Sequence, residues 1–153
     1  GYKFSIKIIE KLVSNFPKQI LGVKDSTYNL YESIKIPNFL VFPGSETKLL
    51  KGLELGCSGI ISAICNVTGS LARKVYDDFH NQKKQVFNQK LCNVRSSFDS
   101  YNLISGLHTF MSEENKIYKR VLPPLDLLSE IQKKELMTKL KKLDFSPGKN
   151  IAA

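Results

Sequence analysis

The chain has 153 residues, of which 42% are hydrophobic, so it can bury one ordinary core. No apolar run approaches the roughly 18 residues of a membrane span, and neither a charged-then-apolar leader nor a cleavage site opens the chain. The net charge of +9 is compatible with nucleic-acid binding, but lysine dominates the cations and acids such as Glu135 and Asp144 interrupt the basic runs. A noncatalytic basic nucleic-acid-binding domain is therefore the weaker alternative, and we expect neither nucleic acid nor membrane as a partner.

The thiols and imidazoles give no sign of a metal site. Cys57, Cys65 and Cys92 are odd in number and lack metal-like spacing, which is typical of reduced thiols in a cytoplasmic protein. His80 and His108 are isolated, so the sequence offers no paired ligands for a metal. A Gly-rich phosphate loop is also missing. We expect a cytoplasmic protein without a bound metal.

The first 80 residues alternate between helical and strand-like patterns. Apolar spacing predicts a first helix over residues 4–16. Strands are predicted at 20–25, 39–45 and 58–64, and helices at 29–36, 46–55 and 71–79. Asn29 with Glu32 resembles a capping box for the helix at 29–36, and Gly56 is the expected cap of the helix at 46–55. This alternation predicts a parallel sheet with crossover helices, and its repeat of about 20–25 residues is close to that of a (β/α)8 barrel.

Beyond about residue 80 the pattern is entirely helical. Apolar spacing predicts two helices between residues 83 and 111, and Ser129 with Gln132 forms a capping box for a last helix. The chain therefore divides into residues 1–80, which carry the strand–helix repeat, and a helical C-terminal region, residues 81–153.

Three motifs of the first 80 residues occur in an order and at separations that resemble a known family. They are ILGVKDST, FLVFPGS and GCSGIISAICNVTG. Together they resemble the C-terminal half of the dihydrodipicolinate synthase / N-acetylneuraminate lyase family, and YKRVLPPLDLLS is similar to its approach to the last helix. Members are TIM barrels that form a Schiff base between a strand-6 lysine and pyruvate. The resemblance implies an α/β fold: the C-terminal part of a (β/α)8 TIM barrel, strands 6–8, followed by an all-helical C-terminal extension.

The resemblance also implies what this chain does not contain. It puts Gly1 just before the fifth helix, so that strands 1–5 are absent. The Thr-Thr pair that holds the pyruvate carboxylate and the catalytic tyrosine belong to that part, and Tyr28 and Tyr31 do not match this tyrosine. We accordingly expect an intact protein of about 290 residues, an ordinary barrel size, that forms a homo-oligomer, a dimer or tetramer.

Lys24 matches the Schiff-base lysine of the family. An amine attacks a ketone only when neutral, and burial in a barrel interior disfavours the charged ammonium. Because side chains alternate along a strand, Val23 and Asp25 are expected to face away from Lys24, so that Asp25 does not pair with it. Without the resemblance, a surface lysine that ends an edge strand would be the favoured interpretation.

The resemblance implies five substrate-binding positions. Gly44 matches the glycine that lets backbone approach the keto acid, and Ser45 and Glu46 lie where members contact the variable part of the substrate. Ile61 matches the strand-8 position whose carbonyl faces pyruvate, and Ala63 matches a substrate-contacting position of sialic acid lyases. Each residue type also has an ordinary structural role, as a turn, an N-cap, a first-turn charge or a core residue.

The implied activity is that of a pyruvate-dependent class I aldolase or lyase, with a covalent Schiff base to the substrate and no cofactor. Lysine-pathway synthases usually carry an N-P-x-P-x-K element where this chain has SYNLISGLHTFM, without proline. This departure favours a lyase that cleaves a 2-keto-3-deoxy sugar acid or related substrate to pyruvate, with Ser45 and Glu46 contacting the hydroxylated tail. The alternatives are 4-hydroxy-tetrahydrodipicolinate synthase, which joins pyruvate and aspartate semialdehyde, and a member that keeps the fold without the activity.

Overall fold

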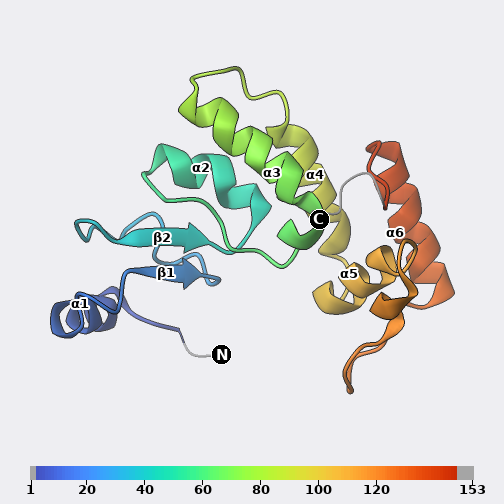
Figure 1. The fold of residues 1–153 in the computed structure, drawn as a ribbon, viewed down its shortest axis with the longest axis horizontal. Helices are drawn as coiled ribbons and strands as arrows, with labels where there is room; N and C mark the ends of the chain where they lie inside the picture. The colour runs from blue at the N-terminus through green and yellow to red at the C-terminus, as the bar shows by residue number, and fades with distance from the viewer. Residues whose placement is uncertain (1–2, 148–153) are drawn as a thin grey trace. The chain divides into compact units, whose positions relative to one another are not determined.

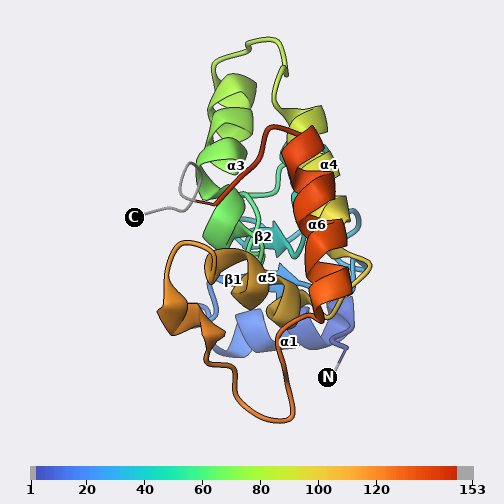
Figure 2. The ribbon, with the colours of Figure 1, turned by 90° about the vertical axis from the view of Figure 1, so that its right-hand side faces the viewer.

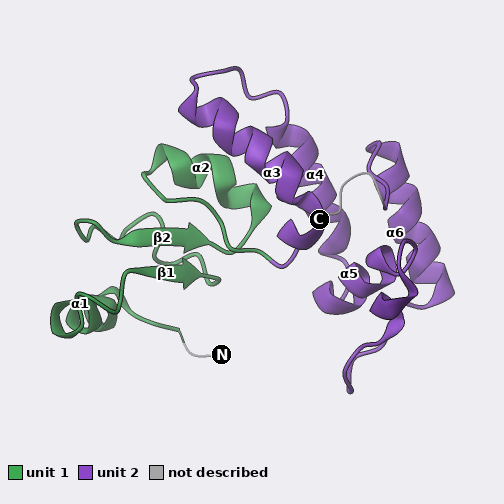
Figure 3. Cartoon of the chain, in the orientation of Figure 1, with its two compact units in different colours: residues 1–62 green, residues 63–153 purple. Residues whose placement is uncertain are grey.

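A computed structural model describes residues 3–147 of the chain (Figure 1), so Gly1 lies outside the described residues. The chain divides into two compact units, residues 1–62 and 63–153 (Figure 3). The first unit contains α1 (Ile6–Asn15), β1 (Gly22–Asp25), β2 (Leu40–Pro43), the 3-10 helix η1 (Glu46–Lys48) and α2 (Leu49–Glu54). The second unit contains α3 (Cys65–His80), α4 (Asn88–Phe98), α5 (Leu103–Met111), the 3-10 helix η2 (Lys116–Lys119) and α6 (Glu130–Lys142).

The strands β1 and β2 pair in parallel, as the repeat predicts. Lys24 lies opposite Phe42 and Asp25 lies opposite Pro43 in the ladder. Paired residues point to the same face of a sheet, so Lys24 and Phe42 share one face while Asp25 and Pro43 share the other. The second face is covered by the first unit's hydrophobic cluster, whose buried members are Ile9, Leu30, Tyr31, Ile34, Val41 and Cys57.

The predicted strand at residues 58–64 is wrong, because this segment forms no strand. The Ser58 N–H donates to the carbonyl of Val41 at 3.0 Å, and the Ile61 N–H donates to the carbonyl of Pro43 at 3.2 Å. Between these two bonds the segment advances by three positions while β2 advances by two. This mismatch is typical of a bulge and not of a regular ladder. Gly59, at φ +143, takes up the extra length, and Pro43 has no N–H with which to extend the pairing.

The predicted helix at residues 29–36 is also wrong, because this segment forms bends and turns. The carboxylate of Asp25 accepts the backbone N–H groups of Leu30 and Tyr31 at 2.9 and 3.0 Å, and that of Thr27 at 3.2 Å. These bonds fold the loop back onto the end of β1, so its N–H groups are satisfied without a helix.

Helices with strong local signals form as predicted. Ser5 caps α1 by accepting the Ile8 N–H at 3.3 Å, and η1 with α2 occupies the predicted helix at 46–55, followed by Gly56 at φ +87. The predicted capping box is present at the start of α6, where Ser129 and Gln132 satisfy each other's backbone groups. These signals succeed because each depends only on neighbouring residues.

The second unit is built from helices, and its described residues, 63–147, contain no strand. The helix α6 packs against α4 and α5 (Figure 2). At the centre of the second unit's core, the ring of Phe110 meets Phe98 edge-on and stacks on Phe145, with centroid separations of 5.9 and 5.6 Å. None of the described helices is both long and apolar enough to cross a membrane.

Candidate active site

The C-terminal ends of β1 and β2 bring together most of the predicted site residues. Lys24 is the third residue of β1, and the Gly44 N–H donates to the carbonyl of Asp25 at 2.9 Å. The Ile61 N–H donates to the carbonyl of Pro43 at 3.2 Å. Three chain segments therefore meet at the edge where α/β barrels carry their chemistry.

Lys24 stands on the open face of the strand pair. Its side chain is exposed, and Leu40 on the same face is 45% exposed, whereas Val41 and Asp25 on the other face are buried. In the barrel that the resemblance implies, this open face is the interior face. Lys24 thus lies on the face opposite the hydrophobic cluster to which α1 contributes Ile9.

Asp25 has a structural task that separates it from Lys24. It is 1% exposed, and besides the three backbone N–H groups its carboxylate accepts the hydroxyl of Thr27 at 3.3 Å. The expectation that Asp25 faces away from Lys24 is confirmed by the strand register and the burial pattern. The lysine is therefore not neutralised by its sequence neighbour.

Gly44 lies close to the loop that follows β1. A Cβ built on Gly44 would lie 3.2 Å from both the Cα and the Oγ of Ser26, and 3.4 Å from the carbonyl oxygen of Asp25. The missing side chain thus allows a close backbone approach at the strand ends. This approach fits both the turn role and the substrate role predicted for Gly44.

Ser45 and Glu46 are both buried in the first unit. Ser45 caps η1 by accepting the Thr47 N–H at 3.3 Å, which is the N-cap role that its residue type allows. Glu46 is 0% exposed, and its carboxylate accepts the Ser62 hydroxyl at 2.8 Å. Both side chains thus hold the segment after β2 in place, and their contact with a substrate stays a prediction.

Ile61 and Ala63 differ in their surroundings. Ile61 is 47% exposed, so the interpretation of Ile61 as a core residue is wrong. Ala63 belongs to the second unit and packs against that unit's hydrophobic cluster, as a core residue does. The structure brings Ile61 to the strand ends of the first unit, and the substrate roles of Ile61 and Ala63 stay predictions.

One feature at the same edge carries no signal in the sequence. The Lys48 ammonium lies over the ring of Tyr28, 5.5 Å from its centroid. Tyr28 follows β1 with a backbone φ of +57, and Lys48 ends η1. The pairing depends on this left-handed loop conformation, which apolar spacing and capping patterns do not reveal.

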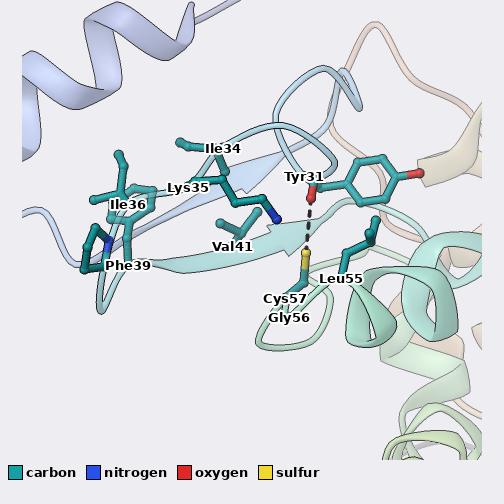
Figure 4. A pocket seen from close by; sticks show the side chains of 10 residues that line it. Tyr31, Ile34, Lys35, Ile36, Phe39, Val41, Leu55, Gly56 and Cys57 are labelled. Atoms are coloured by element: carbon teal, nitrogen blue, oxygen red, sulfur yellow. Dashed lines mark hydrogen bonds between the residues drawn. The ribbon is translucent and has the colours of Figure 1, made fainter.

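A pocket of about 320 Å³ lies on the face of the strand pair that carries Val41 (Figure 4). Val41 lines it, and Val41 alternates with Phe42 along β2. The Cys57 thiol donates to the Tyr31 carbonyl across this pocket at 3.7 Å, and burial raises the pKa of that thiol. None of the six predicted site residues lines it.

The thiols of the chain are not joined to one another in the described residues. Cys57, Cys65 and Cys92 are thiols rather than members of a disulfide. No group of three or more metal-ligating side chains occurs within residues 3–147. The chemistry available at the strand ends is therefore that of an exposed amine, hydroxyl groups and a buried carboxylate.

A parallel strand pair backed by helices defines part of an α/β fold. A family model described as "Dihydrodipicolinate synthetase family" matches residues 1–143. The chain belongs to this family.

Sequence relatives point to two activities within the family. A 4-hydroxy-tetrahydrodipicolinate synthase of Hydrogenobaculum is 39% identical over 71 residues, which are 44% of this chain and 24% of that protein. A 2-dehydro-3-deoxy-D-gluconate/2-dehydro-3-deoxy-phosphogluconate aldolase of Picrophilus torridus is 23% identical over 134 residues, 80% of this chain and 50% of that protein. The chain thus spans between about a quarter and a half of the length of these relatives.

Solved structures share the fold. The dihydrodipicolinate synthase of Thermotoga maritima superposes with a TM-score of 0.79 at 17% identity, covering 91% of this chain and 50% of that one. A prophage protein of the family from E. coli K12, solved in complex with pyruvate, superposes with a TM-score of 0.78 at 21% identity, covering 92% and 51%. The chain therefore has the α/β fold of about half of a dihydrodipicolinate synthase.

Proposed function

We propose that this chain belongs to a pyruvate-dependent class I aldolase or lyase in which Lys24 forms a Schiff base with a 2-keto acid. The observation that carries the proposal is the position of Lys24: it lies at the C-terminal end of β1, on the open face, with Asp25 turned away and engaged by backbone. We also propose the finer assignment that the family resemblance implies, with β1 and β2 as barrel strands 6 and 7 and the bulged segment 58–64 in the place of strand 8.

The chemistry needs the amine in its neutral form. The Lys24 nitrogen attacks the keto carbon and water leaves, which gives the imine. When the carbon–carbon bond breaks, the imine takes up its electron pair as an enamine, and the adjacent hydroxyl loses its proton as it becomes an aldehyde. Protonation of the enamine and addition of water then release pyruvate and regenerate the Lys24 amine. The Lys24 face lacks a carboxylate partner from β1, because Asp25 is held on the other face by the Leu30 and Tyr31 N–H groups.

We propose a 2-keto-3-deoxy sugar acid or a related 2-keto acid as the substrate, with pyruvate as one product. The chain lacks the N-P-x-P-x-K element of the lysine-pathway synthases, and the Picrophilus relative acts, by its name, on a sugar-derived 2-keto acid and its phosphate ester. Polar groups after β2, on Ser45 and Glu46, are proposed contacts for a hydroxylated tail. Gly44, Ile61 and Ala63 are proposed contacts of the keto acid.

The second candidate is 4-hydroxy-tetrahydrodipicolinate synthase. The 39% identity to the Hydrogenobaculum synthase over 71 residues favours it. Its reaction begins with the same imine at Lys24, so the two candidates share the nucleophile and differ in the second substrate. The family match favours both over a noncatalytic nucleic-acid-binding domain.

Three further features belong to the proposal. We expect a cytoplasmic enzyme that forms a homo-oligomer, a dimer or tetramer. We also expect no cofactor, since the covalent imine between lysine and substrate itself serves as the electron sink.

The test compares pyruvate release and pyruvate condensation by the full-length protein. A coupled assay should show pyruvate released from sugar-derived 2-keto acids and poor condensation with aspartate semialdehyde. Lys24→Arg should abolish turnover, whereas Lys51→Arg, a matched change at an exposed position of α2, should not. A clear preference for the semialdehyde would contradict the lyase assignment and favour the synthase. Full turnover by Lys24→Arg would contradict the proposed Schiff-base mechanism.

A further inference from the structure

The pocket beside Val41 has no task in the proposed reaction, because no predicted site residue lines it. Its volume of about 320 Å³ is at the lower end of the roughly 300–1,000 Å³ that small-molecule sites occupy. Its described lining residues all lie within residues 31–57 of the first unit. The pocket is therefore a feature of one compact unit and has room for a small organic ligand.

The walls of the pocket are formed mostly by hydrophobic side chains. Ile34 and Val41 are buried members of the first unit's hydrophobic cluster, and Ile36, Phe39 and Leu55 pack against that cluster. The loop between β1 and β2, which forms turns in place of the predicted helix, supplies much of this wall. These side chains suit the hydrocarbon part of a ligand.

One cation, Lys35, also lines the pocket. Its side chain extends past Val41 toward Tyr31 and Cys57 (Figure 4). The pKa of the Cys57 thiol is raised by burial, and the positive charge of Lys35 acts against that rise. The ammonium is therefore close enough to the thiol for their charges to interact.

The charge of Lys35 is not balanced by an acid. Among residues 3–147, no carboxylate forms an ion pair with Lys35, and no acid lines the pocket. Glu32, the acid nearest to it in sequence, accepts the Tyr31 hydroxyl at 2.5 Å. An ammonium beside hydrophobic walls complements a ligand that has one negative charge and an apolar body.

We propose that this pocket binds a small monocarboxylic acid with a hydrocarbon body. The carboxylate would lie at the Lys35 ammonium, and the hydrocarbon would lie against Ile36, Phe39 and Val41, where it is removed from water. The volume of the pocket favours a short acid over a long acyl chain. The inference does not rest on the proposed function, because Lys24 takes no part in it.

The test uses full-length protein and octanoate, with octanamide as an uncharged molecule of the same length. Calorimetric titration should show one octanoate bound per chain, and octanamide should bind at least about threefold more weakly. Lys35→Gln should weaken octanoate binding by about three- to tenfold, a modest range because the ammonium is exposed. Lys11→Gln, an equal change of net charge at an exposed position of α1, should leave the affinity unchanged.

A second measurement locates the bound acid through Cys57, which lines the pocket. Saturating octanoate should slow the alkylation of Cys57 by iodoacetamide, followed by peptide mass. Alkylation of Cys65 and Cys92, which do not line the pocket, should stay unchanged. Leu55→Trp should fill the pocket and abolish octanoate binding. Thermal unfolding shows whether this variant folds, and Ile36→Trp repeats the comparison should Leu55→Trp unfold.

Several results would overturn the carboxylate site. They are the absence of octanoate binding, equal affinity for octanoate and octanamide, and unchanged octanoate affinity in Lys35→Gln. Equal protection of all three thiols would also contradict it, because the acid would then not be located at the pocket. None of these measurements involves turnover, so failure of the protein to release pyruvate would overturn the proposed function and leave this inference intact.

Discussion

Lys24 and Asp25 are neighbours in β1, yet their side chains lie on opposite faces of the strand pair. Asp25 is 1% exposed and accepts the N–H groups of Leu30 and Tyr31, while Lys24 is exposed on the open face. The acid thus shapes the loop that carries Tyr28, and the lysine remains available for chemistry. Asp25 therefore has the structural role, and its neighbour Lys24 has the proposed catalytic role.

Asp25→Ala should strongly destabilise the protein. It leaves the buried N–H groups of Leu30 and Tyr31 without an acceptor, at a cost of about 1–3 kcal/mol for each. Chemical denaturation of the full-length variant measures the loss. Asp126→Ala, at an exposed position, is the control and should change stability by no more than about 0.5 kcal/mol. Equal stability of the two variants would show that the Asp25 bonds do not hold the loop.

Gly22→Ala should disturb the pairing of β1 with β2. A Cβ on Gly22 would lie 2.5 Å from the carbonyl oxygen of Leu40 and 2.8 Å from its Cβ, so the strands must separate. We expect a loss of about 1–3 kcal/mol, as for an overpacked core, together with reduced activity because Lys24 moves with β1. Gly56→Ala is the comparison: no atom lies within 4 Å of a Cβ at that position, so its loss of stability comes from the φ of +87 and not from crowding. Unchanged stability of Gly22→Ala would contradict the strand register.

The stability of the protein should fall between pH 10 and pH 12 because of Tyr31. Its hydroxyl donates to Glu32 at 2.5 Å, and this bond, with burial, raises the pKa of Tyr31 from 10.0 to about 12. A raised pKa in the folded state favours the neutral phenol, so the stabilisation is complete below pH 10 and is lost as the pH rises to about 12. Denaturation at several alkaline pH values should show this loss, and Tyr31→Phe should reduce it. The same loss in Tyr31→Phe would assign it to other groups.

Local signals in the sequence predict the helices better than the sheet. The helices α1 and α6 follow from caps and apolar spacing that involve residues a few positions apart. The helix at 29–36 fails because the Asp25 carboxylate takes the N–H groups that a helix would have used. The prediction of a strand at 58–64 fails because Pro43 and Gly59 prevent regular pairing of this segment with β2. The apolar content of the segment does not indicate whether such pairing is possible.

The sequence predicts those residues of the candidate site that lie at, or directly after, the C-terminal end of a strand. Lys24, Gly44, Ser45 and Glu46 come directly from β1 and β2, so the strand–helix pattern and the family motifs predict where they gather. The burial of Glu46 against Ser62 and the contact of Lys48 with Tyr28 were not predictable. Both join residues 16 to 20 positions apart through loop conformations that only the folded chain defines.

The central claim is that the Lys24 amine forms an imine with pyruvate. Reduction of the full-length protein with borohydride in the presence of pyruvate should add one reduced pyruvate per chain, located by peptide mass at Lys24. Lys24→Arg should lose both the label and turnover while it keeps its fold, because guanidinium stays protonated and cannot form the imine. A label on another lysine, or no label at all, would contradict the account.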